Sequence, residues 1–227
     1  MNKLLPIAEL IKEFLEMKFR EEAKYTFECK KEWLVNTPDK ELYREFWDEI
    51  TCVYSGLVDN KWSLDSILLN SNNESKYDNA RMDIWFHEPY NFMCEFDEKQ
   101  HFNQFRLINL RTEFYKNNPS FDYNHYLDLS ESKIHNPGKS GFEKLKGKDS
   151  LFPEMLDGEN QDNRIRQRAF RDFLKDIVPV RLGYNPTVRI SYKVTNNKTK
   201  DFNQTDLNSV VKYFNDIDFL NKIKYSI

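Results

Sequence analysis

Residues 80–101 read ARMDIWFHEPYNFMCEFDEKQH, and this stretch decides the predicted fold. Residues 80–86 and 91–99 both alternate between apolar and polar side chains, and HEPYN supplies a proline-containing connection between them. Because successive side chains of a strand point to opposite faces, this alternation predicts a β-hairpin. On the second strand, one face would carry Phe92, Cys94 and Phe96, and the other would carry Met93, Glu95, Asp97 and Lys99.

Outside the hairpin, helical periodicity dominates the first seventy residues. Apolar side chains recur at helical spacing around residues 4–17 and again over 39–57. Residues 1–70 are therefore predicted to form an N-terminal helical region, and residues 71–227 a core. The core would contain, in order, the hairpin, a helix after His101, a turn-rich insert at about 117–160, an amphipathic helix at 161–177, a strand at 187–194 and a last helix at 206–217. This order predicts an α/β or α+β fold.

Composition excludes several classes of protein. No apolar run approaches the roughly 20 residues that span a bilayer, so we expect no membrane partner and a cytoplasmic location. Three widely separated cysteines, Cys29, Cys52 and Cys94, fit neither a disulfide framework nor a zinc ribbon. With 34 basic and 37 acidic side chains, the formal net charge is −3. This charge excludes a protein that binds nucleic acids through a generally basic surface. Any nucleic-acid binding must then come from local basic patches.

The hairpin also gathers acidic side chains on adjacent strands. If the strands pair, Asp83 can converge with Glu95 and Asp97 on a divalent cation, because Mg²⁺ takes carboxylate oxygens while it keeps waters and phosphate oxygens. A metal held there would polarise a phosphoryl group and lower the pKa of a bound water. Lys99, on the same face as Asp97, would orient the attacking water or neutralise charge in the transition state. The alternative is that these charges form only the solvated face of a strand.

This acidic motif resembles the PD-(D/E)xK nuclease superfamily, which includes many restriction endonucleases. Two registers fit the resemblance. In one, Asp97-Glu98-Lys99 is the D-x-K element and Asp83 is the upstream acid. In the other, which we favour, the string EFDEKQHF is similar to the E-x-D-x-x-Q-H variant of relatives of very-short-patch repair endonucleases, although Glu98 stands where those relatives commonly have glycine. The candidate catalytic residues over both registers are Asp83, Glu95, Asp97, Lys99, Gln100 and His101, and the candidate metal ligands are Asp83, Glu95 and Asp97.

The resemblance implies a restriction-endonuclease-like core, with a mixed central sheet flanked by helices, over about residues 80–194. It also implies a helix rich in Arg or Lys followed by a final core strand. The implied function is an Mg²⁺- or Mn²⁺-dependent DNA endonuclease, and a Type II restriction enzyme in particular. Such an enzyme would act on double-stranded DNA as a homodimer and would have a cognate DNA methyltransferase. The alternatives are a repair or homing nicking endonuclease, and a non-catalytic nucleic-acid-binding module with a nuclease-like fold.

Basic side chains suggest where DNA would bind. The helix predicted at 161–177 carries Arg164, Arg166, Arg168 and Arg171. Arg166 lies near the apolar stripe of this helix, so we expect it to reach the site, and we expect the others to contact phosphates. For Arg164, Arg168 and Arg171, the alternative is pairing along the helix with Asp162, Asp172 or Asp176. In the insert, Lys139, Lys144 and Lys146 stand among aromatic residues, a mixture typical of phosphate clamps and base readers.

Overall fold

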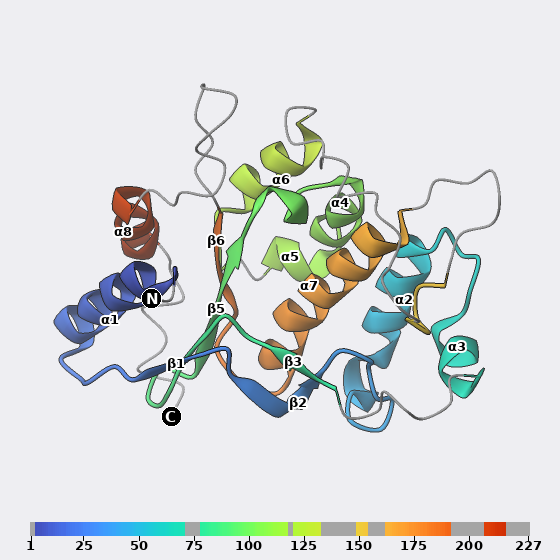
Figure 1. The fold of residues 1–227 in the computed structure, drawn as a ribbon, viewed down its shortest axis with the longest axis horizontal. Helices are drawn as coiled ribbons and strands as arrows, with labels where there is room; N and C mark the ends of the chain where they lie inside the picture. The colour runs from blue at the N-terminus through green and yellow to red at the C-terminus, as the bar shows by residue number, and fades with distance from the viewer. Residues whose placement is uncertain are drawn as a thin grey trace.

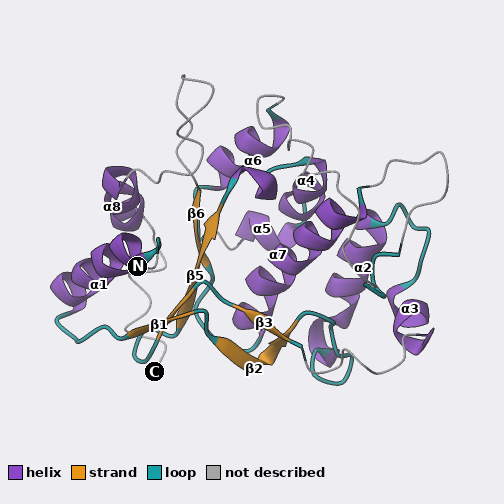
Figure 2. Ribbon diagram, viewed as in Figure 1, coloured by secondary structure: helices purple, strands orange, loops and turns teal. Residues whose placement is uncertain are grey.

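A computed structural model describes residues 3–70, 78–117, 120–132, 149–153, 162–191 and 207–216. These residues form a mixed fold in which helices lie on both sides of a central sheet (Figure 1). In Figure 2 the strands separate α1 (Leu5–Phe19) and α8 (Leu207–Asp216) from a larger group of helices. The predicted mixture of helices and strands is confirmed. None of the helices in the described ranges is both long enough and apolar enough to cross a membrane.

The central sheet brings together strands from distant parts of the chain. Among the described residues, its order is β1, β4, β5 and β6. The bounds are Tyr25–Phe27 for β1, Ile84–Phe86 for β4, Phe92–Asp97 for β5 and Val188–Ser191 for β6. The pairs β1–β4 and β4–β5 are antiparallel, whereas β5 and β6 run parallel with Glu95 opposite Arg189. The predicted hairpin is present as β4 and β5, although residues 79–81 at the start of its expected first strand pair in a second sheet instead. The predicted strand at 187–194 is present as β6, next to β5 in the same mixed sheet.

The other elements surround this sheet. The remaining α-helices are α2 (Trp47–Leu57), α3 (Leu64–Asn70), α4 (Gln104–Leu110), α5 (Glu113–Asn117), α6 (Tyr123–Glu131) and α7 (Asn163–Arg181). Short 3₁₀ helices span Arg44–Phe46 and Lys99–His101. A small second sheet pairs β2 (Lys30–Val35) with β3 (Asn79–Arg81). The helices predicted at 161–177 and 206–217 are confirmed as α7 and α8.

The N-terminal seventy residues are not purely helical, contrary to the prediction. Both β1 and β2 arise in this region, and β1 pairs with β4 at the edge of the central sheet. A strand as short as β1 shows no period in the sequence, so its pairing partner decides its conformation. The N-terminal region therefore supplies part of the same sheet that carries the hairpin.

The helix predicted over residues 39–57 is also shorter than expected. The Asp39 carboxylate accepts hydrogen bonds from the backbone N–H groups of Glu41 (2.8 Å) and Leu42 (3.1 Å). This is the hydrogen-bonding pattern of a helix N-cap, but the turn that Asp39 caps leads into a 3₁₀ helix at Arg44–Phe46 rather than directly into an α-helix. The α-helical part, α2, consequently begins only at Trp47.

Each face of the central sheet has its own apolar core. Phe92 and Cys94 pack in the core formed with α1 and α8, whereas Met93 packs with Trp85 and with α2, α4 and α7. This confirms the predicted alternation of faces along the second hairpin strand. Glu95 and Asp97 share a face with Met93, because side chains two apart on a strand point the same way. The strand therefore directs both carboxylates toward α7.

The predicted insert at 117–160 is described only in part. Its described residues include α6 and the segment 149–153. Tyr54 of α2 donates a hydrogen bond to the Leu151 carbonyl at 2.5 Å, so this segment packs against the helical core. Lys139, Lys144 and Lys146, the predicted DNA-contacting lysines, lie outside the described residues.

Candidate functional site

Two acidic side chains hold each other in place beside the hairpin. Asp83 comes directly before β4, and its backbone N–H donates to Glu95 Oε1 at 3.0 Å. In return, the backbone N–H of Phe96 donates to Asp83 Oδ2 at 2.9 Å. These reciprocal bonds place the carboxylates of Asp83 and Glu95 next to each other. Two of the three carboxylates expected to converge therefore do so.

A lysine that the motif does not contain completes this pair. Lys175 of α7 donates from Nζ to Glu95 Oε2 at 2.6 Å, and both side chains are largely buried. Burial raises the pKa of Glu95 to about 7 even though the Lys175 ammonium lowers it, and the nearby Asp83 carboxylate adds to the rise. Burial by itself lowers the pKa of Lys175, but the Glu95 carboxylate outweighs it, so Lys175 stays a cation. A carboxyl group that titrates near neutrality beside a fixed cation is typical of catalytic sites.

A small polar cavity lies in front of these groups. Its volume is about 240 Å³. The residues that line it are Lys3, Leu4, Asp83, Glu95, Phe96, Glu98, His101 and Lys175. This volume is below the range of about 300–1,000 Å³ that is usual for drug-sized ligands. The cavity therefore suits a small charged group, such as a phosphate with a hydrated cation, better than a whole nucleotide cofactor.

Asp97 does not join Asp83 and Glu95, which corrects the prediction of a three-carboxylate metal site. Arg189 Nη1 donates to both oxygens of Asp97, at 2.8 and 2.9 Å, and the Tyr126 hydroxyl donates to Asp97 Oδ2 at 3.0 Å. All of these groups are buried. Side chains two apart on a strand stand roughly 6.6 Å from each other, so a strong partner can draw one away from the other. That partner is Arg189, which lies on β6, the strand next to β5.

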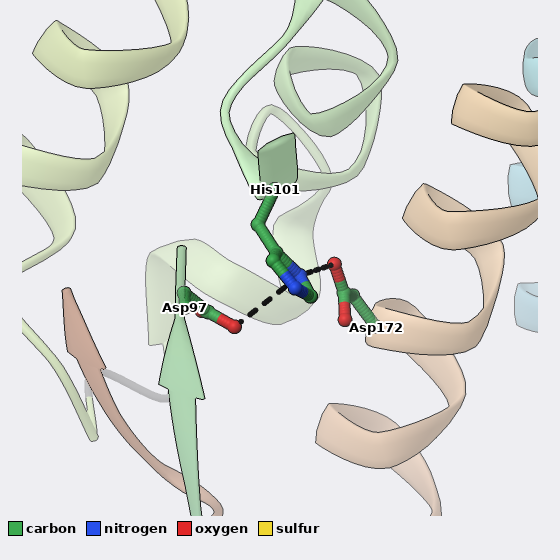
Figure 3. Close-up of side chains that lie close together, drawn as sticks. All are labelled: Asp97, His101 and Asp172. Carbon is green, nitrogen blue, oxygen red and sulfur yellow. Dashed lines mark hydrogen bonds and ion pairs between the residues drawn. The ribbon is translucent and has the colours of Figure 1, made fainter. Parts of the chain in front are cut away.

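His101 lies between Asp97 and a second aspartate, Asp172 of α7 (Figure 3). Its Nδ1 is 2.8 Å from Asp172 Oδ2 and 3.4 Å from Asp97 Oδ1. Among the described residues, these three form the group of potential metal ligands whose ligand atoms all lie within 4.8 Å of one another. Burial by itself lowers the pKa of His101, but the carboxylates of Asp172 and Asp97 outweigh it and raise the pKa above 6.5.

The surroundings of this triad already supply positive charge. Arg189 donates from Nε to Asp176 at 2.6 Å and from Nη2 to the Asp172 carbonyl at 3.0 Å. Arg106 donates to Asp176 at 3.0 Å. With His101 protonated, the three aspartates Asp97, Asp172 and Asp176 face three cations, so the buried network is neutral. Arginine side chains thus already bond the carboxylates around this triad, whereas Asp83 and Glu95 line the cavity.

Because the pKa of His101 is raised in the folded protein, the free energy of unfolding should depend on pH. Protonation of His101 favours the folded state, so its contribution is complete below pH 6.5 and is lost as the pH rises through the raised pKa. We expect the unfolding free energy of the wild type to exceed that of His101→Gln most at pH 6 and least at pH 9. Urea denaturation of both proteins over this range measures the difference. A difference that does not change with pH would contradict an imidazolium in the folded state.

The structure places the other motif residues away from the cavity. Lys99 and Gln100 belong to the 3₁₀ helix that follows β5, so the alternation that put Lys99 on the face of Asp97 ends before it. Neither residue lines the cavity. Gln100 donates to Glu98 Oε2 at 3.2 Å, and its carbonyl accepts from Arg168 at 3.5 Å. Lys175, from a different element, has the position predicted for Lys99.

The predicted DNA-binding arginines of α7 have protein partners. Arg166 is buried and bonds Asp162 at 2.6 Å and Asp59 at 2.8 Å, so the expectation that it reaches the site is wrong. Its position at the apolar stripe turns it into the core between α2 and α7 instead. Arg164 bonds Gln167, and Arg171 lies 3.4 Å from Asp149. The sequence suggested pairing one turn away for Arg164, Arg168 and Arg171, whereas in the structure it is Arg166 that pairs with Asp162, four positions before it.

Four residues that complete the site were not predicted from the sequence to belong to it: Asp172, Lys175, Arg189 and Tyr126. One signal was available. Asp172, Lys175 and Asp176 stand three and four positions apart, which makes a charged stripe on a helix otherwise defined by its apolar face. Such a stripe beside an apolar one indicates buried polar contacts. The partners of the stripe, however, lie on other elements, and no pattern in the sequence links them to it.

One protein family matches residues 67–205, and its description is a family of unknown function, DUF7255. The chain belongs to this family. The matched region includes β4, β5, α7 and β6, and with them the carboxylate pair, Lys175 and the buried network. Helix α1 and strand β1 lie before it. No curated protein and no solved structure matches the chain.

Proposed function

We propose that this member of the DUF7255 family is an Mg²⁺-dependent DNA endonuclease that hydrolyses phosphodiester bonds. The observation that carries the proposal is the pair Asp83 and Glu95, held together by reciprocal backbone bonds and joined by Lys175 in a small polar cavity. The arrangement of elements supports it, since the resemblance implies a mixed sheet flanked by helices and a basic helix before the last core strand. Here α7 leads to β6, which lies next to the strand of Glu95.

The donor set fits a hard divalent cation. Asp83 and Glu95 would hold Mg²⁺ or Mn²⁺, which prefers one or two carboxylates together with waters and phosphate oxygens. Once bound, the ion would polarise the phosphoryl group and lower the pKa of a bound water. We infer a single cation, because Asp97 is held on both oxygens by Arg189 and Lys175 already contacts Glu95.

The residues of the chain divide the remaining work. The Lys175 ammonium, fixed by Glu95, would stabilise the charge that develops on the phosphoryl oxygens, the role the motif predicted for Lys99. His101 lines the same cavity with its ring oriented by Asp172, so it can exchange a proton with a water or a leaving oxygen. Arg189 keeps Asp97 and Asp172 in place around that ring.

The finer assignment rests on the resemblance. Within the proposal, the protein is a Type II restriction endonuclease that cuts double-stranded DNA as a homodimer, with a cognate DNA methyltransferase and a cytoplasmic location. A repair or homing nicking endonuclease would use the same site. A palindromic target calls for two sites related by a two-fold axis, whereas a nick needs one. The number of strands cut per encounter separates these roles.

One observation favours the second candidate, a non-catalytic nucleic-acid-binding module. Asp97, an acid of the motif, is neutralised by Arg189 and is fully buried, so the motif does not act as one metal site. A module of this kind would bind nucleic acid without metal-dependent turnover. It would also keep its affinity when Asp83 is neutralised.

The test is cleavage of a mixture of unmethylated phage and plasmid DNAs in Mg²⁺ or EDTA, beside Asp83→Asn. Asparagine keeps an acceptor for the Phe96 N–H but loses the charge, so we expect more than about 100-fold loss of cutting, since even partners of metal ligands cost 10- to 100-fold. Mg²⁺-dependent bands that vanish with Asp83→Asn would support a site-specific endonuclease, and a smear a non-specific one. DNA that stays intact in Mg²⁺, and also when Mn²⁺ replaces it, would reject the proposal in favour of the binding module.

A further inference from the structure

We propose that Lys3, at the start of α1, binds a phosphate of the nucleic-acid backbone next to the scissile bond. This inference rests on the proposed function and adds a substrate contact to it. Lys3 and Leu4 line the cavity together with Asp83, Glu95 and Lys175. They come from the opposite end of the chain to α7 and precede the region matched by the family. The start of α1 lies beside the central sheet (Figure 1).

In the structure, Lys3 forms an ion pair with the carboxylate of Glu98, which also lines the cavity. Lys3 Nζ is 2.7 Å from Glu98 Oε1 and 6.0 Å from the centre of the Phe96 ring. The Lys3 side chain is 72% exposed and the Glu98 side chain 27%. An ion pair near the surface gains little Coulomb energy, because water and salt screen it. The pair therefore contributes little to stability, and either member can change partner at low cost.

The cavity offers an incoming phosphate few cations. Among the described residues that line it, the cationic side chains are Lys3, Lys175 and His101. Lys175 is committed to Glu95 and is only 16% exposed, and His101 is held by Asp172. Lys3 is the member of this set that is itself well exposed, and its ion pair with Glu98 can exchange. A phosphate that enters beside the carboxylate pair can replace Glu98 as the acceptor for the Lys3 ammonium.

The chemistry fits a backbone phosphate rather than a base. Lysine binds phosphate as a point charge on a flexible stem, without the planar fork that reads base edges. Such a contact adds affinity and salt dependence but no sequence preference. It also gives the N-terminal segment a role in the site, because Lys3 adds a second lysine to the lining of the cavity.

The test uses the two members of one ion pair, Lys3→Gln and Glu98→Gln, in the full chain. Binding of a fluorescein-labelled DNA duplex of random sequence is measured by anisotropy in EDTA over a salt series. We expect Lys3→Gln to weaken binding about fivefold and to reduce the slope of log affinity against log salt by about one. Glu98→Gln frees the ammonium and removes a like charge from the path of the phosphate, so we expect it to tighten binding. Lys24→Gln serves as the control for the charge change, because Lys24 is about as exposed as Lys3 (68% against 72%) and also pairs with a glutamate, Glu22.

The opposite signs separate a ligand contact from a structural one. If Lys3→Gln and Glu98→Gln both weaken binding, or both leave it unchanged, the inference is overturned. A loss with Lys24→Gln as large as that with Lys3→Gln would also overturn it, since a general charge effect would then suffice. Wild-type protein that cuts DNA while Lys3→Gln binds normally would reject only this inference. Wild-type protein that neither binds nor cuts DNA would reject the proposed function as well.

Discussion

Lys175→Gln is expected to lower Mg²⁺-dependent DNA cleavage by about 100- to 1,000-fold, the usual cost of removing one group that stabilises transition-state charge. The reason is geometric. Lys175 Nζ lies 2.6 Å from Glu95 Oε2 inside the cavity, so its ammonium is adjacent to the proposed metal pair. Lys99, the lysine that the motif nominates, does not line the cavity. Lys99→Gln is therefore expected to retain most of the activity.

The fold should survive this substitution. Removal of a buried partner usually leaves an uncompensated charge, but the pKa of Glu95 is already about 7 because of burial. Without Lys175, Glu95 takes up a proton, and the cost stays limited. Single-turnover cleavage at saturating Mg²⁺, beside thermal denaturation of the same samples, separates chemistry from folding. Normal cleavage by Lys175→Gln together with inactive Lys99→Gln would return the catalytic role to the motif lysine.

Arg189→Met is expected to destabilise the protein by about 3–5 kcal/mol, because breaking a buried ion pair leaves uncompensated charge behind. Arg189 is the shared partner of Asp97 and Asp176, at 2.8 and 2.6 Å, and all three are buried. Natural domains have about 5–15 kcal/mol of stability in total, so this loss would remove a large part of it. Urea denaturation of the variant and the wild type measures the change.

Arg181→Met is the matched control for this prediction. Arg181 is the last residue of α7, eight positions before Arg189, and pairs with Glu49 at 2.6 Å. Its side chain, however, is 40% exposed. The same substitution there should cost at most about 1 kcal/mol. Equal losses for Arg181→Met and Arg189→Met would contradict the role of burial. If Arg189→Met does not fold, Arg189→Lys keeps the charge without the fork and should unfold at a lower urea concentration than the wild type.

Local patterns were sufficient for a large part of the fold. The alternation over 80–99 predicts β4 and β5, and the apolar stripe over 161–177 predicts α7, because each pattern reflects burial of one face of a single element. Strand pairing between neighbours along the chain then brings Asp83 to Glu95. The same reasoning fails for β1, whose three residues carry no period and whose partner is distant.

The sequence by itself determined the acidic hairpin, its buried and polar faces, and the meeting of Asp83 with Glu95. Only the tertiary structure decided which of the two acids on β5, Glu95 or Asp97, can bind a ligand in the cavity. Glu95 and Asp97 are both carboxylic acids on one face of one strand, so no local rule distinguishes them. Arg189 from β6 neutralises the Asp97 carboxylate. Lys175 from α7 bonds Glu95, which lines the cavity. These partners come from elements far along the chain, and the charge state of a buried acid depends on such neighbours rather than on its own motif.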